Sequence, residues 1–423
     1  MAGPPRDPRA AIDAVWRIEA PRLIAGLARV VRDVGVAEDL AQDALVAALE
    51  TWPRTGVPDN PGAWLMAIGK RRAIDGFRRA ATLERKREEL AFRVGAELAL
   101  ARDAAEAARD DAVGDDLLSL MFTCCHPVLS TQARITLTLR MLGGLKTDEI
   151  ARAYLTTEAT IAQRIVRAKR TLAEAGVGFA APSAEDLPER LASVLEVVYL
   201  IFNEGYSATA GDDWLRPDLC LDALRLGRVL AELSPREPEV HGLVALMEIQ
   251  ASRLAARTAA DGSPVLLLDQ DRARWDRLLI ARGLAALERA EACAAPGGPY
   301  VAQAAIAACH ARAPRAEATD WVRIAALYEA LARLAPSPIV EVNRAVALGM
   351  AFGPAAGLEV ADALVAAGAL PGSHLLPSVR ADLLERLGRR EEAHAELIRA
   401  AELTRNARER ALLEERARAV AES

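Results

Sequence analysis

Apolar residues recur at helical spacing through the N-terminal part of the chain. They follow the i, i+3, i+4 pattern of one helix face in residues 11–31 and again in residues 37–52. The segment Pro53–Pro61 contains three prolines and predicts a loop. Asn60 then has the position of an N-cap before a helix that starts at Pro61 and runs to about Arg79.

Helical spacing returns in residues 117–172, where Gly143-Gly144 interrupts it. Within this stretch a short amphipathic segment, residues 147–154, precedes a longer basic segment, residues 158–172. A short helix, a tight turn and a longer basic helix form the helix-turn-helix pattern, although the turn at residues 155–157 lacks the common glycine. We therefore predict a helix-turn-helix domain.

The remainder of the chain has the pattern of helices joined by short turns, after a boundary rich in Gly and Pro at residues 175–188. Near the C-terminus two similar runs of alanine and leucine contain Gly353 and Gly388, which are 35 positions apart. This spacing is close to the ~34-residue period of tetratricopeptide repeats. The predicted fold is all-α, with two small helical domains followed by a partly tetratricopeptide-like extension. The expected segments are 10–82, a linker at 83–115, the helix-turn-helix domain at 116–175, and extension domains at 176–300 and 301–423.

Composition supports the all-α prediction. The chain has 423 residues, of which 52% are apolar but only 4% aromatic, because alanine and leucine dominate. These residues favour helices, whereas strands favour β-branched and aromatic residues. The net charge of −6 is unevenly distributed: residues 1–175 carry 26 positive and 24 negative side chains, and residues 176–423 carry 27 and 35. The halves therefore differ, at +2 and −8, and we expect them to have different roles.

The five cysteines predict free thiols rather than disulfides, because their number is odd and the N-terminus does not resemble a signal peptide. We expect a cytoplasmic protein that does not contact the membrane. The adjacent Cys124, Cys125 and His126 raise the possibility of a metal site, but adjacent cysteines chelate poorly and the other cysteines show no paired spacing. We expect buried packing residues, with no metal and no cofactor. A redox role for these thiols has no support in the sequence.

Two basic segments have the character of nucleic-acid-binding helices. In residues 60–79 five basic side chains face one acidic residue, Asp75, and phosphates are the obvious partners for such a charge. Trp64 in this segment either seats the helix or stacks on an unpaired base. In residues 158–172, polar and basic side chains alternate with Ile161, Ile165 and Ala168, which would pack the helix on its neighbour. The alternative for both segments is a solvated basic face.

Together these segments resemble the ECF-type sigma factors of bacterial RNA polymerase. The family pattern is an acidic, glutamine-containing helix, a Trp-Leu pair with a basic stretch, and a second domain with a basic helix after a turn. It corresponds here to residues 37–52, 63–79 and 137–172. The resemblance covers about residues 11–172. It implies a dissociable subunit of RNA polymerase that recognises promoters and has no catalytic activity of its own.

The resemblance also implies roles for individual residues. Asp39, Gln42 and Asp43 would dock onto the polymerase, whose β′ and β subunits are the expected protein partners. Trp64, Lys70, Arg71, Arg72, Arg78 and Arg79 would engage and melt the minus-ten element. Thr160, Gln163, Arg164 and Arg167 would read the minus-thirty-five element, with Lys169 and Arg170 as further basic residues of that helix. The acidic linker would lie in a basic channel of the polymerase.

The extension contains polar residues that we expect to have structural or regulatory roles. These are Asn203, Glu204, Tyr206, Asp269, Gln270 and Asp271. They could form an acid–base set, but no nucleophile, phosphate loop or metal set accompanies them, so capping and ion pairing are the favoured interpretation. We expect the acidic extension to control access to DNA or polymerase, without a separate anti-sigma protein. The alternatives are a stand-alone helix-turn-helix regulator, or a solenoid scaffold or enzyme whose function lies after residue 190.

Overall fold

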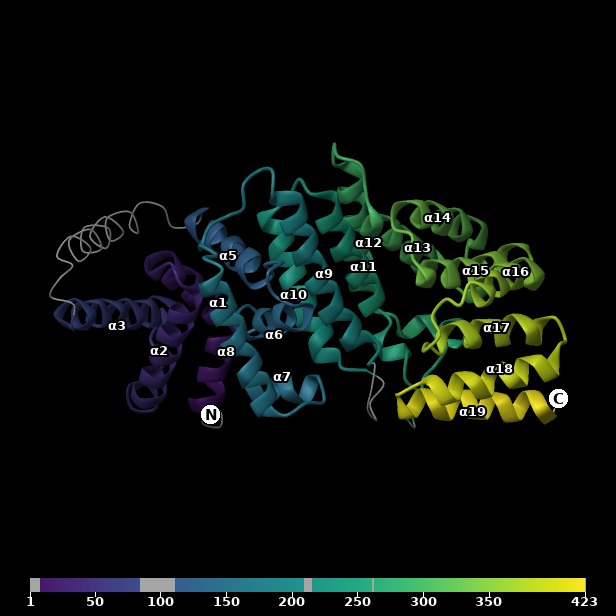
Figure 1. Cartoon of the computed structure of the whole chain (residues 1–423), viewed down its shortest axis with the longest axis horizontal. Coiled ribbons are helices and arrows are strands. Elements are labelled where there is room, and N and C mark those ends of the chain that lie inside the picture. The colour runs from purple at the N-terminus through teal and green to yellow at the C-terminus, as the bar shows by residue number, and fades with distance from the viewer. Residues whose placement is uncertain (1–7, 84–110, 209–214, 261, 423) are drawn as a thin grey trace, which may run out of the picture. The chain divides into compact units, whose positions relative to one another are not determined.

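The computed structural model describes residues 8–83, 111–208, 215–260 and 262–422 (Figure 1). Within these ranges the regular structure is helical, apart from an isolated β-bridge between Thr258 and Pro264, so the predicted all-α fold is confirmed. The chain forms two compact units, residues 1–198 and residues 199–423. No helix in the described ranges is both long and apolar enough to cross a membrane.

The first unit begins with three helices, α1 (Pro8–Val31), α2 (Val34–Thr55) and α3 (Pro61–Leu83), which pack on one another. Asp33 caps α2 by accepting from the backbone amide of Val36 at 2.9 Å. The predicted N-cap is also confirmed, because Asn60 accepts from the amide of Ala63 at 3.0 Å. The expected loop was placed too early: α2 continues past Pro53 to Thr55, because a proline there removes only one hydrogen bond near the helix end.

The predicted helix-turn-helix elements follow. The helices are α5 (Asp111–Cys124), α6 (Thr131–Met141), α7 (Thr147–Ala153) and α8 (Glu158–Glu174). Most of the predicted acidic linker, residues 84–110, lies outside the described residues, while residues 111–115 form the start of α5. Helix α5 packs on α1, so the two N-terminal groups of helices share one compact unit.

Helix α9 (Leu187–Tyr206) completes the first unit with its N-terminal half. Arg190 donates to the carbonyl of Phe122 at 2.6 Å, and Ser193 donates to the carbonyl of Cys125 at 2.5 Å. These bonds satisfy carbonyls at the C-terminal end of α5, where a helix has no internal donors. The first compact unit therefore extends to Val198, beyond the boundary at residue 175 that the sequence suggests.

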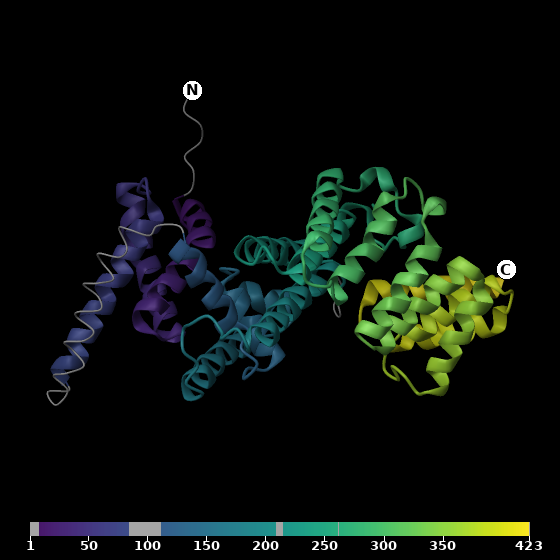
Figure 2. The same cartoon turned by 90° about the horizontal axis from the view of Figure 1, so that it is seen from above.

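The second unit is a succession of antiparallel helices (Figures 1 and 2). Its elements are α10 (Pro217–Leu233), α11 (Pro238–Ala251), η1 (Leu254–Ala256), η2 (Leu267–Asp269), η3 (Arg272–Arg274), α12 (Arg277–Ala292), α13 (Pro299–Arg312), η4 (Ala316–Ala318), α14 (Trp321–Leu334), α15 (Pro338–Phe352), α16 (Pro354–Ala366), α17 (Leu375–Arg386), α18 (Arg390–Leu403) and α19 (Ala407–Glu422). Nearly all of α11 is buried, because α10, α12 and α13 surround it.

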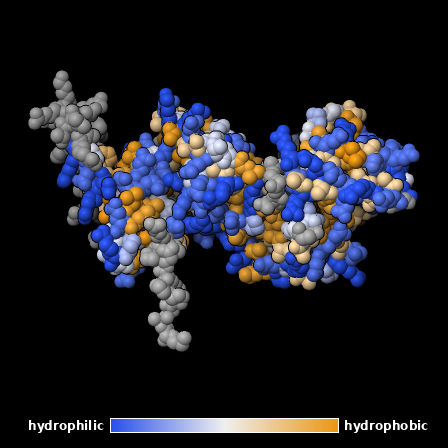
Figure 3. Space-filling view, turned by 90° about the horizontal axis from the view of Figure 1, so that it is seen from below, coloured by the Kyte–Doolittle hydropathy of each residue, from blue (hydrophilic) through white to orange (hydrophobic). Residues whose placement is uncertain are grey.

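The two glycines of the proposed repeat lie at corresponding turns. Gly353 joins α15 to α16 with a φ of 101°, and Gly388 follows α17 with a φ of 75°. Both values lie in the region that glycine adopts without steric cost. Each glycine thus lies in a turn between two helices, although Gly353 alone separates α15 from α16 while residues 387–389 separate α17 from α18, and the repeat stays a prediction. Hydrophilic side chains cover much of the face shown in Figure 3, with smaller hydrophobic groups among them.

Candidate nucleic-acid interface

Helix α3 presents the first basic surface. The side chains of Arg71, Arg72 and Arg78 are exposed, whereas Lys70 is partly buried. Burial lowers the pKa of Lys70, and the nearby charge of Arg29 lowers it further. The side chain of Arg79 lies outside the described residues. The helix therefore displays a positive face that a phosphate backbone would neutralise.

Trp64 lies at the start of this helix, against a second tryptophan. Its ring contacts Trp52 of α2 in an edge-on arrangement, with centroids 5.2 Å apart and planes at 61°. Trp52 is only 3% exposed, whereas Trp64 is partly exposed. Trp64 therefore helps to seat α3 on α2 and keeps part of its ring accessible.

Helix α8 presents the second surface. Its inner face, with Ile161, Ile165 and Ala168, is buried, as the sequence predicts. Its outer face carries exposed Gln163 and Arg167. The same face borders a hollow of about 430 Å³, which is lined by Val128, Leu129, Ser130, Ala133, Thr160, Gln163, Arg164, Arg167, Ala168 and Thr171. Three of the four residues expected to read bases are thus exposed beside an open surface between α6 and α8.

Three other predicted residues of α8 have partners within the chain. Thr160 shares a hydrogen bond of 2.8 Å with the capping hydroxyl of Thr157. Arg164 is partly buried and donates to the hydroxyl of Thr136 on α6 at 3.3 Å. Arg170 pairs with Glu174 one turn further along the helix. These local contacts orient the side chains but leave Thr160 and Arg170 exposed.

The acidic side of α2 carries the residues expected to dock onto a protein partner. Asp39 is exposed and lies 3.0 Å from the Nζ atom of Lys169. Asp43 lies 3.4 Å from Arg72 of α3, and Gln42 donates to Glu38 at 3.4 Å. Lys169, expected to contact DNA, is thus occupied by carboxylates of α2. Its role in DNA binding stays a prediction, and it requires this ion pair to open.

Sequence reasoning missed Glu38, which is only 4% exposed. Its carboxylate is held by Arg140 of α6, whose Nε donates at 3.0 Å, and by Lys169 of α8. Burial acts to raise the pKa of Glu38, but the two cations outweigh it and the pKa is lowered. A signal existed in the sequence, because Glu38 lies within the apolar stripe that includes Ala37 and Ala41, where a charge needs a partner.

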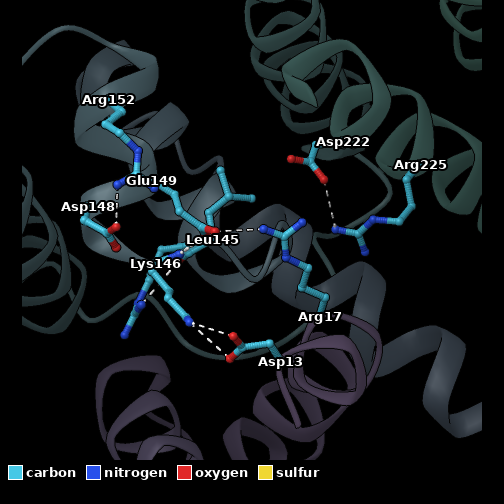
Figure 4. Close-up of polar contacts among 10 residues, drawn as sticks. Asp13, Arg17, Leu145, Lys146, Asp148, Glu149, Arg152, Asp222 and Arg225 are labelled. Carbon is cyan, nitrogen blue, oxygen red and sulfur yellow. Dashed lines mark hydrogen bonds and ion pairs between the residues drawn. The ribbon is translucent and has the colours of Figure 1, made fainter. Parts of the chain in front are cut away.

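Further ion pairs join α1 to the helix-turn-helix (Figure 4). Lys146 lies 3.1 Å from Asp13, and Arg17 lies 2.8 Å from Glu149. Glu149 also accepts from the backbone amide of Lys146 at 2.8 Å, and so caps α7. Polar contacts thus connect α1 and α2 to α6, α7 and α8.

The two adjacent cysteines are packing residues, as the sequence predicts. Cys124 and Cys125 are at most 1% exposed. Burial raises the pKa of Cys125 to about 11 and that of Cys124 well above its usual value. Burial also lowers the pKa of His126, with a contribution from Arg190. Among the described residues no group of three potential ligands could hold a metal ion.

Four of the six polar residues singled out in the extension have structural partners. Glu204 forms an ion pair with Arg216, and Asp271 caps η3 by accepting from Ala273 at 2.9 Å. Gln270 is buried and donates to the carbonyl of Val265, whereas Asn203 and Asp269 are exposed. Tyr206 stacks on Phe202 and lies beneath the guanidinium of Arg257, at 3.8 Å. The capping and ion-pairing interpretation holds for Glu204 and Asp271.

Sequence reasoning singled out Tyr206 but missed the cluster of arginines and aromatic rings around it in the second unit. Arg253 lies over the rings of both Tyr206 and Trp275, at 5.7 Å from each centroid. Arg272 lies 4.8 Å from the same Trp275 ring, and its guanidinium donates to the carbonyl of His310 at 2.6 Å. Cation–π contacts of this kind hold charged groups beside an apolar core. The cluster supports the fold of the extension.

An all-α chain with a helix-turn-helix and a second basic helix is typical of DNA-binding transcription proteins, and the comparison with known families agrees. The sigma-70 region 2 model matches residues 16–82, the sigma-70 region 4 model matches residues 119–172, and a family of unknown function (DUF6596) matches residues 190–291. The chain belongs to the ECF-type sigma-70 family.

The chain is similar to two relatives along different parts of its length. An uncharacterized protein of Rhizobium meliloti (strain 1021) is 44% identical over 414 residues, which span 95% of this chain and 94% of the relative. The probable ECF RNA polymerase sigma factor SigI of Mycobacterium tuberculosis is 27% identical over 175 residues, which span 41% of this chain and 58% of that protein. No solved structure matches the chain.

Proposed function

We propose that the chain directs core RNA polymerase to promoters through α2, α3 and α8. The observation that carries the proposal is the orientation of α8, whose apolar face is buried while Gln163 and Arg167 are exposed beside a hollow surface. A recognition helix requires this arrangement, because base edges are read by polar side chains in the major groove. The exposed basic face of α3 supports a second DNA contact.

The proposed roles divide by helix. Asp39, Gln42 and Asp43 of α2 dock onto the β′ subunit of the polymerase. On α3, Trp64 and the basic residues Lys70, Arg71, Arg72, Arg78 and Arg79 contact the minus-ten element. On α8, Thr160, Gln163, Arg164 and Arg167 read the minus-thirty-five element, with Lys169 and Arg170 on phosphates. Exposed Arg71 and Arg167 therefore give the clearest tests.

Promoter-dependent transcription with purified core polymerase tests these roles. We expect Arg71→Ala to lower promoter affinity and to reduce the slope of log affinity against log salt by about 1 if it loses one phosphate contact, whereas Arg167→Ala should lower affinity and relax the specificity for the minus-thirty-five element. Arg333→Ala is a matched control, because this exposed arginine of α14 pairs with Glu329 on its own helix. Unchanged transcription in both α3 and α8 variants would contradict the proposal.

The same experiment distinguishes a sigma factor from a stand-alone helix-turn-helix regulator. Such a protein would bind duplex promoter DNA tightly without polymerase, and Asp39→Ala would leave its DNA occupancy unchanged. The proposed sigma factor depends on polymerase for stable promoter binding, so that Asp39→Ala reduces transcription. Loss of DNA occupancy on removal of polymerase supports the proposal, and retention of full occupancy supports the regulator.

We further propose that the extension regulates this activity without a separate anti-sigma protein. The charge difference supports the proposal, since residues 176–423 carry a net −8 and the DNA-binding part a net +2. Because α9 packs into the first unit, a cut within residues 176–198 would remove part of that unit. A protease site inserted after Ala208 lets the full chain fold before cleavage. Unchanged transcription and polymerase affinity after separation of the fragments would contradict regulation by the extension.

A further inference from the structure

Three arginines of the second unit gather around two aromatic rings. Arg253 and Arg257 flank the short helix η1, and Arg272 begins η3. The guanidinium groups of Arg253 and Arg257 lie 5.7 and 3.8 Å from the ring centroid of Tyr206. Those of Arg253 and Arg272 lie 5.7 and 4.8 Å from the ring centroid of Trp275. Arg253 therefore shares a ring with each of the other two arginines. We call Arg253, Arg257 and Arg272 the arginine cluster.

Two arginines of the cluster have no carboxylate partner within the described part of the chain. Arg253 contacts the two rings, and Arg272, which is 7% exposed, donates to neutral acceptors. These acceptors are the carbonyls of His310 and Ala313, at 2.6 and 2.7 Å, and the hydroxyl of Thr319, at 3.2 Å. A buried charge costs free energy unless an opposite charge offsets it. The arginine cluster therefore favours the binding of an anion.

Other arginines of the second unit that are largely buried do have carboxylate partners. The side chains of Arg216 and Arg380 are 15% and 16% exposed. Arg216 forms an ion pair with Glu204, and Arg380 forms one with Glu396. The arginine cluster differs from these sites, because the described carboxylates do not neutralise Arg253 and Arg272. This difference indicates an anion from outside the chain.

Two titratable neighbours of the cluster are neutral near pH 7. Burial lowers the pKa of His310 to about 4, with contributions from Arg253 and Arg272, so its imidazole carries no charge. Burial raises the pKa of Tyr328 to about 12, although Arg253 acts to lower it, so its phenol keeps its proton. The pKa of Arg272 is lowered by burial and by Arg253, while Glu317 acts to raise it without forming an ion pair. The described residues therefore leave a positive potential at the cluster.

Buried hydrogen-bond donors around Arg253 also lack partners. Among the described residues nothing accepts from the Nε atoms of Arg253 and Arg272, the indole nitrogen of Trp275 or the hydroxyl of Tyr206. Buried polar groups in folded proteins normally have a partner. All four of these groups can donate, so a molecule rich in acceptors would satisfy them. Arg253 is partly exposed, and the cluster therefore borders solvent.

We propose that the arginine cluster binds the carboxylate or phosphate group of a small molecule, with Arg253 as the main contact and the Tyr206 hydroxyl as a second donor. Guanidinium groups bind such oxyanions through paired N–H donors as well as through charge. Tyr206 and Trp275 are only 7% and 3% exposed, so the site admits a compact anionic group rather than an extended chain. The site lies within the second unit, and the inference does not rest on the proposed function in transcription.

Hydrogen exchange of the full chain tests this site. The probes are inorganic phosphate and succinate, each compared with sodium chloride at the same ionic strength. A ligand that binds the folded state stabilises it, so we expect at least one probe to give a saturable increase in the protection of peptides from α11 and α13. Phosphate bound to α3 or α8 would protect peptides of the first unit instead. No saturable protection of α11 and α13 by either probe would overturn the proposal, and the probe that binds more tightly identifies the oxyanion.

Arg253→Met separates binding from a structural role. Methionine keeps an apolar side chain against Tyr206 and Trp275 but removes the charge, so the affinity for the probe should fall at least about tenfold. A role in folding alone would lower protection with and without the probe and leave the affinity for the probe unchanged. Arg333→Ala is the matched control, because this exposed arginine of α14 pairs with Glu329 on its own helix. A folded Arg253→Met that binds the probe as tightly as the natural chain would sink the proposal.

Tyr206→Phe changes the site while keeping its rings. It retains the ring that Arg253 and Arg257 contact and removes only the hydroxyl, for which the described residues supply no partner. We expect protection without the probe to stay the same. The affinity for the probe should fall at least about tenfold, as for the loss of one hydrogen bond to a charged group. Unchanged affinity in this folded variant contradicts the proposal.

Discussion

The guanidinium of Arg134 on α6 donates to the hydroxyl of Ser193 on α9 at 2.6 Å, and this hydroxyl donates in turn to the carbonyl of Cys125. Arg134 also pairs with Glu196 one turn later, at 3.0 Å. The start of α9 is therefore joined to the helix-turn-helix by a short chain of polar contacts. The first residues matched by the family of unknown function thus form part of the first compact unit.

Ser193→Ala is expected to loosen this junction. The side chain is buried, so its loss leaves a donor of Arg134 and the Cys125 carbonyl without a partner, at a cost of about 1–3 kcal/mol in the free energy of unfolding. Denaturant unfolding of the full chain measures the effect. Ser183→Ala is the control, because that exposed hydroxyl bonds only to nearby Asp186. If Ser193→Ala and Ser183→Ala lowered the free energy of unfolding by the same amount, Ser193 would not stabilise the junction of α9 with the helix-turn-helix.

Asp116 should make the first unit more stable at mildly acidic pH than at neutral pH. Burial raises its pKa to about 6, although Arg29, at 3.4 Å, acts to lower it. The folded state therefore takes up a proton as pH falls through about 6, before the unfolded chain does near its ordinary value of 3.8. Acidification from pH 7.5 to about 5 should then stabilise the contact of α5 with α1, by about 1.4 kcal/mol.

Hydrogen exchange of peptides from α1 and α5 measures this dependence. We expect protection to be higher at about pH 5 in the natural chain than in Asp116→Asn, because in the variant the lowered pKa of His126 still acts to reduce stability on acidification while the contribution of Asp116 is absent. Above about pH 5 the lowered pKa of Glu38 does not contribute, because its stabilisation is lost only below its ordinary value. A difference in protection between the natural chain and Asp116→Asn that does not change from pH 7.5 to about 5 would contradict the raised pKa of Asp116.

His310 should make the second unit less stable as pH falls. Burial lowers the pKa of its imidazole to about 4, with contributions from Arg253 and Arg272. The folded state keeps the ring neutral, so the unfolded chain takes up a proton first as pH falls below the ordinary value of 6.5. Stability of the second unit should then fall between about pH 6.5 and 4, by at most about 3 kcal/mol.

His310→Phe isolates this contribution. Phenylalanine keeps a ring against Trp321, whose centroid lies 5.2 Å from that of His310, but it does not titrate. The difference in unfolding free energy between the two chains should grow in favour of the variant as pH falls. A constant difference across the range would show that His310 does not titrate with a lowered pKa.

The sequence predicted local features well where one helix determines them. The buried face of α8 follows from Ile161, Ile165 and Ala168, whose spacing places them on one side whatever the helix packs against. The N-cap at Asn60 and the turns at Gly353 and Gly388 are local for the same reason. Such features depend on periodicity and turn chemistry, which the sequence contains.

The ion pairs of Glu38 with Arg140 and Lys169 could not be predicted from the sequence, because they depend on packing between distant segments. Glu38 and Lys169 are 131 positions apart, so the apolar stripe around Glu38 indicates that its charge needs a partner but does not identify Lys169 as that partner. Lys169 was accordingly assigned to DNA with its basic neighbours. Packing between distant segments also decides where the first compact unit ends, since contacts such as Arg190 to the Phe122 carbonyl join the start of α9 to it.

The turn of the helix-turn-helix contains a leucine where a glycine is common, and this leucine adopts a strained backbone conformation. Leu155 has a φ of 48°, in the left-handed region, and its side chain is 58% exposed. A residue with a Cβ atom is strained there by about 1–2 kcal/mol, and glycine is not. Exposure means that little packing is lost when the side chain is removed.

Leu155→Gly should therefore be more stable than Leu155→Ala by about 1 kcal/mol, because both lose the same side chain and only glycine relieves the backbone strain. At an ordinary helical position the order is the reverse, since glycine there is less stable than alanine by a similar amount. Hydrogen exchange in α7 and α8 measures the local opening free energy. An alanine variant as stable as the glycine variant would show that Leu155 does not hold the left-handed conformation in solution.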